Sequence, residues 1–116
     1  MPLGLGLSEA AAASSGTSVT TAGATSTSGS TVVLAGGWES ATDFTSFTDS
    51  NSNTWTQIQT ELVGSGHDTR AYYAQDIVGG TGHTFTLAIT GGSFGCSIWA
   101  VEATGTATTD VLDQSA

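Results

Sequence analysis

The aromatic residues are confined to one part of this chain, and this places the hydrophobic core. Residues 1–30 contain no Trp, Phe or Tyr and consist largely of Gly, Ala, Ser and Thr, whereas residues 31–116 hold all the aromatic residues. A segment that buries so little apolar surface does not offset the entropy lost on ordering it. The pattern predicts an extended arm over residues 1–30 and a folded domain over residues 31–116. Within the arm we expect one strand at residues 18–21, and at residues 10–13 no more than a helical turn.

After residue 30, short runs rich in Thr, Val, Ile and aromatic residues are separated by Gly, Asn, Asp and Ser, which is typical of β-strands. The clearest run is 83–89, where Phe85, Leu87 and Ile89 alternate with polar or small residues. A run at 95–103 is apolar on both faces, as in a buried central strand. With no amphipathic helix, the pattern predicts an all-β fold, an antiparallel β-sandwich of immunoglobulin-like or jelly-roll-like type. The other expected strands cover residues 31–38, 44–48, 54–63 with a bulge, 69–75 and 106–112.

The charge balance excludes several classes of function. The chain has one Arg, no Lys and ten acidic residues, for a formal net charge of −9. Proteins that bind nucleic acid or an acidic membrane surface need many more basic residues. A single Cys rules out a disulfide within the chain and a thiolate zinc site. Residues 1–16 lack the basic start of a signal peptide. We therefore expect no cofactor, no nucleic acid and no membrane as partners.

The candidates for catalysis and metal binding are few. His67 and Asp68 lie in a predicted loop near several Ser residues, but no nucleophile elbow places a serine beside them. His83 pairs with His67 as a conceivable metal site, yet a third ligand at recognisable spacing is missing. We predict no catalytic residue, no metal and no enzyme activity. A pocket in which His67 or His83 faced an acid would reverse this prediction.

An acidic stretch, residues 49–53, begins like a calcium loop with alternating Asp and Asn. The sixth position, which needs Gly, is Thr54, and the twelfth, which needs Glu, is Thr60. Asp and Asn also form tight turns through their own side chains. The stretch therefore predicts a turn, with weak calcium binding as the alternative.

Two further residues are candidates for a structural pair. Glu102 follows the apolar sequence Trp99-Ala100-Val101, and an inward-facing Glu needs a partner. Arg70 is the only Lys or Arg in the chain, so we hypothesise an Arg70–Glu102 pair. Cys96, in the same apolar run, is expected to be a buried free thiol.

Three stretches carry a resemblance to a known family. They are the Asp-Ser-…-Asn-Thr-Trp-Thr segment at 49–56, the Gly-Thr-Gly-His-Thr-Phe-Thr segment at 80–86, and Ile-Trp-Ala-Val-Glu at 98–102, followed by Gly105 and Asp-Gln-Ser at 113–115. Together they resemble small β-sandwich modules of bacteriophage virion proteins and bacterial surface or secreted proteins. The resemblance covers about three-quarters of the chain. It implies a sandwich used for structure and attachment, and it implies no catalytic residues.

The resemblance, together with the predicted arm, implies a capsid decoration (cement) protein on the outer surface of a virion. Its expected partners are the major capsid protein and copies of itself, with a trimer favoured. The arm would add strands to a shell protein through its small-sided backbone, and we expect residues 31–116 to fold without it. The alternatives are a tail or fibre attachment module and a carbohydrate-binding sandwich that uses Trp38, Trp55 and Trp99. The candidate partner-binding residues of the arm are Pro2, Leu3, Leu5, Leu7 and Val19.

Overall fold

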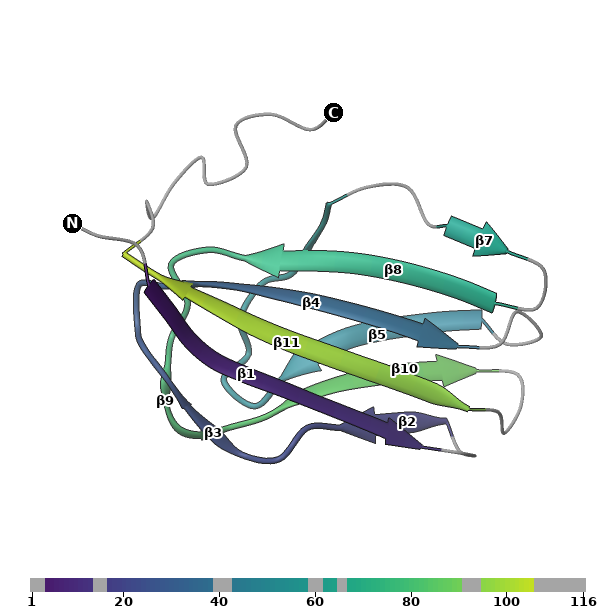
Figure 1. Ribbon diagram of the computed structural model, residues 1–116, viewed down its shortest axis with the longest axis horizontal. Helices are drawn as coiled ribbons and strands as arrows, with labels where there is room; N and C mark the ends of the chain where they lie inside the picture. The colour runs from purple at the N-terminus through teal and green to yellow at the C-terminus, as the bar shows by residue number, and fades with distance from the viewer. Residues whose placement is uncertain are drawn as a thin grey trace.

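The computed structural model describes residues 4–13, 17–38, 43–58, 62–64, 67–90 and 95–105. In these ranges the chain forms strands joined by turns and loops, so the fold is all-β, as predicted (Figure 1). These same ranges hold no helix long and apolar enough to cross a membrane.

The larger of the sheets has six strands, and all of its pairings are antiparallel. The N-terminal strand forms one edge and the strand nearest the described C-terminal end lies beside it. Across the sheet the order is β1 (Gly4–Ala13), β11 (Cys96–Thr104), β4 (Thr31–Trp38), β8 (His67–Ala74) and β6 (Thr56–Gln57), with β7 (Leu62–Gly64) also paired to β8.

Two smaller sheets make up the second layer, behind the larger sheet in Figure 1. One has the order β2 (Ser18–Thr20), β10 (Phe85–Thr90), β5 (Asp43–Asp49), and the other pairs β3 (Ala24–Ser26) with β9 (Gly80–His83). These pairings are antiparallel too. The architecture is an antiparallel β-sandwich, which confirms the predicted fold class.

The hydrophobic core lies between the two layers and follows the alternation of the strands. Phe85, Leu87 and Ile89 of β10 point inward and are buried, as the sequence pattern predicts. The larger sheet contributes the alternate residues of β4 and β11. Its fully buried apolar side chains are Val32, Leu34, Ile98 and Ala100.

The N-terminal segment differs from the loose arm that its composition favours. β1 pairs with β11 over residues 4–13, β2 pairs with β10 and β3 pairs with β9. Leu7 and Val19 are buried in the core. Residues 10–13 continue β1 and form no helical turn. The reason is that a strand of small residues still satisfies its backbone groups against a sheet edge, and composition does not show this.

The division at residue 30 therefore follows composition and not contacts. Independent folding of residues 31–116 stays a prediction. Deletion of β1, β2 and β3 would expose the strand edges of β11, β10 and β9 that they cover. Pro2 and Leu3 lie outside the described residues.

Two other strand predictions need adjustment. β11 is central in its sheet, but only its inner face is buried, because Trp99 and Val101 point to the solvent side. The run at 54–63 contributes two short strands, β6 and β7, whose partner in each case is β8. The strand expected at 106–112 lies outside the described residues.

A pair of leucines on β1 tests whether this strand belongs to the fold. Leu7 is 7 % exposed and Leu5 is 82 % exposed. We expect Leu7→Ala to lower the free energy of unfolding by about 2–4 kcal/mol, as for other buried leucines. Leu5→Ala, the matched control, should change it by less than about 0.5 kcal/mol. Urea denaturation measures both, and equal effects of the two changes would mean that β1 is not docked.

Candidate functional site

The most chemically suggestive cluster joins three elements of the second layer. His83 at the end of β9 is fully buried, and its Nε2–H donates to Oδ2 of Asp49 at 2.6 Å. Its Nδ1 lies 2.6 Å from Oγ of Ser26 on β3. Since a carboxylate only accepts, the Nε2 proton assignment follows from the Asp49 contact. A Ser–His–Asp chain thus crosses from β3 through β9 to β5.

Asp49 is held by a turn that the sequence predicts. Its Oδ1 accepts from the backbone N–H of Asn53 at 2.9 Å and from Nε1 of Trp55 at 3.1 Å. Its Oδ2 also accepts from Nδ2 of Asn53 at 2.7 Å. The Asn53 side chain then bonds both backbone groups of Val78. The 49–53 stretch is therefore a turn, and its Asn53 side chain binds the loop that precedes β9.

The Ser–His–Asp chain is arranged differently from the machinery of a hydrolase. In a hydrolase, Nε2 of the histidine faces the serine and Nδ1 faces the carboxylate; here the two ring nitrogens have exchanged roles. Ser26 is 5 % exposed, and its Oγ also accepts from the backbone N–H of Gly80 at 3.2 Å. His83 packs against the Phe85 ring, with the centroids 4.4 Å apart. The Ser26 hydroxyl is therefore not accessible to a substrate in this structure. The Ser26–His83–Asp49 hydrogen bonds link three strands inside the core.

The other sequence candidates for this chemistry lie elsewhere. His67 and Asp68 open strand β8 and do not belong to a loop. Their side chains lie outside the described part of the structure. The described residues contain no group of three or more His, Cys, Asp or Glu able to hold a metal ion. In the 49–53 stretch, for which calcium binding is the alternative, the two carboxylate oxygens of Asp49 already accept four hydrogen bonds from the protein.

The hypothesised Arg70–Glu102 pair is replaced by other contacts. Glu102 is fully buried, as an inward-facing residue of β11. Its Oε1 accepts from the backbone N–H of Leu7 at 3.1 Å, and its Oε2 accepts from the N–H of Thr27 at 2.7 Å and lies 2.5 Å from the Ser30 hydroxyl. Glu102 lies opposite Val32, whereas Arg70 lies opposite Gly36, four residues along β4, or about 13 Å away along the strand.

The shape of β1 fits this carboxyl group. The register of β1 on β11 shifts between Leu5 and Ser8, and this irregularity turns the Leu7 N–H toward Glu102. A Cβ atom at Gly6 would overlap the Glu102 carboxyl group. Glycine at this position therefore allows the close approach.

The solvent side of the larger sheet, here called the outer face, is the candidate binding surface. Directly opposite residues of neighbouring strands point to the same side of a sheet. One row across the outer face is Ser8, Val101, Val33, Tyr73 and Thr56, and the next is Ala10, Trp99, Ala35 and Ala71. A third row is Ala12, Ser97, Gly37 and Thr69, and a fourth holds Leu5 and Ala103.

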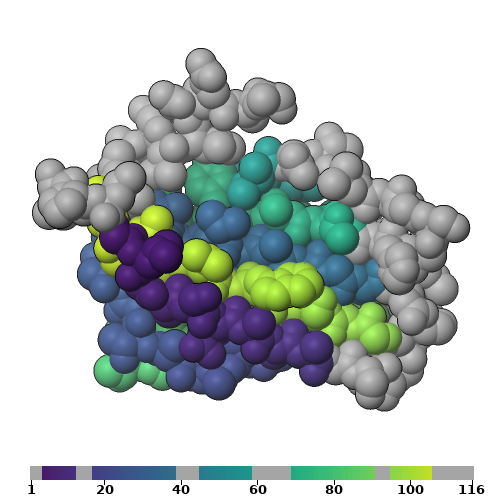
Figure 2. Space-filling model, viewed as in Figure 1, coloured from purple at the N-terminus to yellow at the C-terminus, as the bar shows by residue number. Residues whose placement is uncertain are grey.

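None of these residues is charged. Trp99, Val101 and Val33 expose 50 %, 41 % and 39 % of their surfaces, and the strands that carry them lie side by side toward the viewer in Figure 2. Contiguous exposed apolar surface of this kind marks interaction sites in soluble proteins.

The three Trp residues do not form one platform. Trp38 is buried, and Trp55 packs against the core with its ring edge-on to Phe85. Only Trp99 is exposed among the three. Cys96 is buried, as predicted, and burial raises the pKa of its thiol above the ordinary value.

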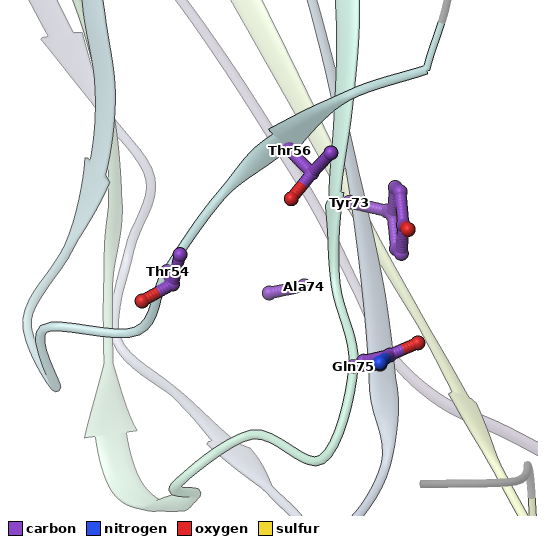
Figure 3. A pocket seen from close by; sticks show the side chains of 5 residues that line it. All are labelled: Thr54, Thr56, Tyr73, Ala74 and Gln75. Carbon is purple, nitrogen blue, oxygen red and sulfur yellow. The ribbon is translucent and has the colours of Figure 1, made fainter. Parts of the chain in front are cut away.

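A pocket of about 200 Å³ adjoins the outer face. It is lined by Thr54, Thr56, Tyr73, Ala74 and Gln75, which Figure 3 shows around the gap between β6 and the end of β8. Tyr73 and Thr56 belong both to this pocket and to the outer face. The pocket is smaller than typical sites for drug-sized ligands, and its lining is uncharged.

Comparisons of the chain with protein-family models, with curated proteins and with solved structures give no match. The resemblance to phage and bacterial surface modules therefore stays an expectation from the sequence.

Sequence reasoning missed the Asp49–His83 contact, although it singled out both residues. They are 34 positions apart, and only the pairing of β5 with β10, which sets Asp49 opposite Phe85, brings them together. The available signal was that both residues are ionisable and stand at the ends of predicted strands, 44–48 and 83–89.

Asp49 makes the stability of the fold depend on pH. Burial raises the pKa of its carboxyl, but the hydrogen bonds from His83, Asn53 and Trp55 together lower it by more, so this pKa lies below the ordinary 3.8. A group with a lowered pKa stabilises the fold above its unfolded-state pKa and loses this contribution as pH falls through the folded-state pKa. We expect the free energy of unfolding to drop below about pH 4, and to drop less in Asp49→Asn.

Urea denaturation at several pH values between neutral and acidic measures this difference. Asp76→Asn serves as the control, because Asp76 is an exposed acid of a nearby loop. An Asp49→Asn protein whose stability falls with acid as steeply as that of the wild type would contradict the assignment.

Proposed function

We propose that this protein is a non-enzymatic structural protein of a bacteriophage virion, and that it decorates the outer surface of the shell by binding the major capsid protein. The observation that carries the proposal is the outer face, an uncharged sheet surface with Trp99 and Val101 half-exposed, which suits a chain that works in an assembly with other protein chains. Burial of apolar surface is the main favourable term in protein association. That the particle is a bacteriophage virion is inferred from the sequence resemblance to virion modules alone.

The charge of the chain supports a place on the outside of a particle. A net charge of −9 with a single Arg keeps the protein soluble at high local concentration and repels nucleic acid. Glu9 lies opposite the inward-facing Ala100. Asp49 and Glu102 bond to buried partners, and Asp76 lies beside Gly29 in the turn before β4, so these acids also lie off the outer face. An uncharged face on an acidic protein is suited to contact with another uncharged protein surface.

The arm has a smaller part in this proposal than its composition suggests. Leu7 and Val19 pack in the protein's own core and are not free to bind a partner. Leu5 is 82 % exposed and extends the outer face at the edge of the sheet. Of the candidate arm residues described, Leu5 is therefore the one that fits a role in partner binding.

The absence of enzyme activity is also part of the proposal. Ser26 and His83 are buried and are satisfied by Gly80 and Asp49. The pocket beside β6 is formed by other residues.

One observation favours the second candidate, a carbohydrate-binding attachment module. The pocket presents two Thr side chains, a Gln and the Tyr73 ring, and Trp99 lies in the next row of the same face. Aromatic rings beside polar groups suit a sugar ring. This candidate predicts binding to isolated sugars and needs no shell.

Co-sedimentation with purified shells that lack this protein tests the proposal. We expect the protein to pellet with the shells at a fixed ratio to the major capsid protein that saturates as more is added. Quantitative mass spectrometry of the pellet gives that ratio, and a matched sample without shells is the control. No binding to shells, together with a change in Trp fluorescence on titration with sugars, would replace the proposal by the carbohydrate-binding candidate.

A further inference from the structure

The rows of the outer face have the composition of a protein interface. Val101, Val33 and Trp99 occupy the middle of the sheet, and its margin mixes Ser and Thr with Leu5 and small apolar residues. An apolar and aromatic centre that lacks charged residues is usual in such contacts.

The size of the face is also adequate. Its four rows contain 15 residues, and since each occupies about 4.8 Å across the strands and about 6.8 Å along them, the footprint is about 500 Å². A standard interface buries about 800 Å² per partner, so most of such a contact fits on this face.

The sizes of the side chains on the outer face indicate which partner binds it. The row that contains Trp99 has only small residues besides it, namely Ala10, Ala35 and Ala71. The face therefore carries a bulky indole and, in the same row, small side chains against which a bulky ring can pack. In a contact between two identical faces, the indole of each copy can pack on the small residues of the other.

The charges point to the same occupant. A basic partner would be attracted to the acids of this chain, yet no described acid lies on the outer face. Two copies that meet through this face bring no described charge into the contact, and the remaining repulsion between the chains is screened by salt. We propose that the outer face binds the outer face of a second copy of this chain, as two sheets packed face to face about 10 Å apart.

This inference goes beyond the proposed function, because it assigns the face to a second copy and is tested without shells. A contact of identical faces closes with two copies, in contrast to the trimer that the sequence resemblance favours. The shell would then be contacted by another surface of the pair.

Light scattering after gel filtration, with protein loaded at up to about 200 µM, measures the mass, since a contact with a Kd of about 10 µM is mostly filled there. We expect twice the chain mass of 11.5 kDa. Val101→Glu places a charge in the middle of the face and should weaken the pair at least about tenfold. Val78→Glu is the matched control, because Val78 is 61 % exposed and lies in a loop off this face.

Trp99→Ala is a second variant, in case Val101→Glu does not fold. It removes the projecting ring from an exposed position and should also weaken the pair, with an unchanged circular dichroism spectrum. Wild-type protein that stays at the mass of one chain, or that forms three-chain particles unaffected by either change, would overturn the inference. If one-chain protein still binds shells and Val101→Glu abolishes this binding, the face belongs to the shell contact, and the proposed function stands without the inference.

Discussion

The buried carboxyl group of Glu102 is the constraint on which the N-terminal half of the sandwich depends. An acid at this inward position of β11 needs hydrogen-bond donors, because an unsatisfied buried polar group is costly. The donors come from Leu7 on β1 and from Thr27 and Ser30 in the turn before β4. One side chain therefore holds two segments, β1 and the turn at residues 27–30, that composition alone would leave loose. The irregularity in β1 and the glycine at position 6 follow from the same requirement.

The hydrogen bonds among Ser26, His83 and Asp49 hold segments of the second layer together in the same way. They tie β3, β9 and β5 together through contacts of 2.6 Å, and the Asn53 side chain extends the link to Val78. A small core with many Ser, Thr, Gly and Ala residues gains specificity from such satisfied polar networks. Both networks lie inside the sandwich. Apart from Val78, the exposed large apolar side chains of the described residues lie on the outer face, and the proposals about partners rest on that face.

Local pattern predicted the strands whose alternation is strict. β4 was predicted with its observed bounds, and the inward residues of β10 were predicted one by one. The pattern failed where contacts between distant segments decide the structure. β1 has one buried large side chain, Leu7, and is held by pairing with β11 and by Glu102. The choice of Arg70 as partner for Glu102 failed because only side-chain pairs were considered, whereas two of the actual donors are backbone N–H groups, which no sequence pattern reveals.

The free energy of unfolding of Glu102→Gln, compared with that of Arg70→Met and of the double variant, tests this account most directly. The amide that Glu102→Gln introduces keeps the shape of the side chain but presents a donor to backbone donors, so we expect a loss of about 1–3 kcal/mol. The effects of the two changes should add to within about 0.5 kcal/mol, because the residues do not interact. A Glu102→Gln protein as stable as the wild type, or a strong coupling between the two positions, would contradict the claim that Glu102 holds the N-terminal strands in the fold.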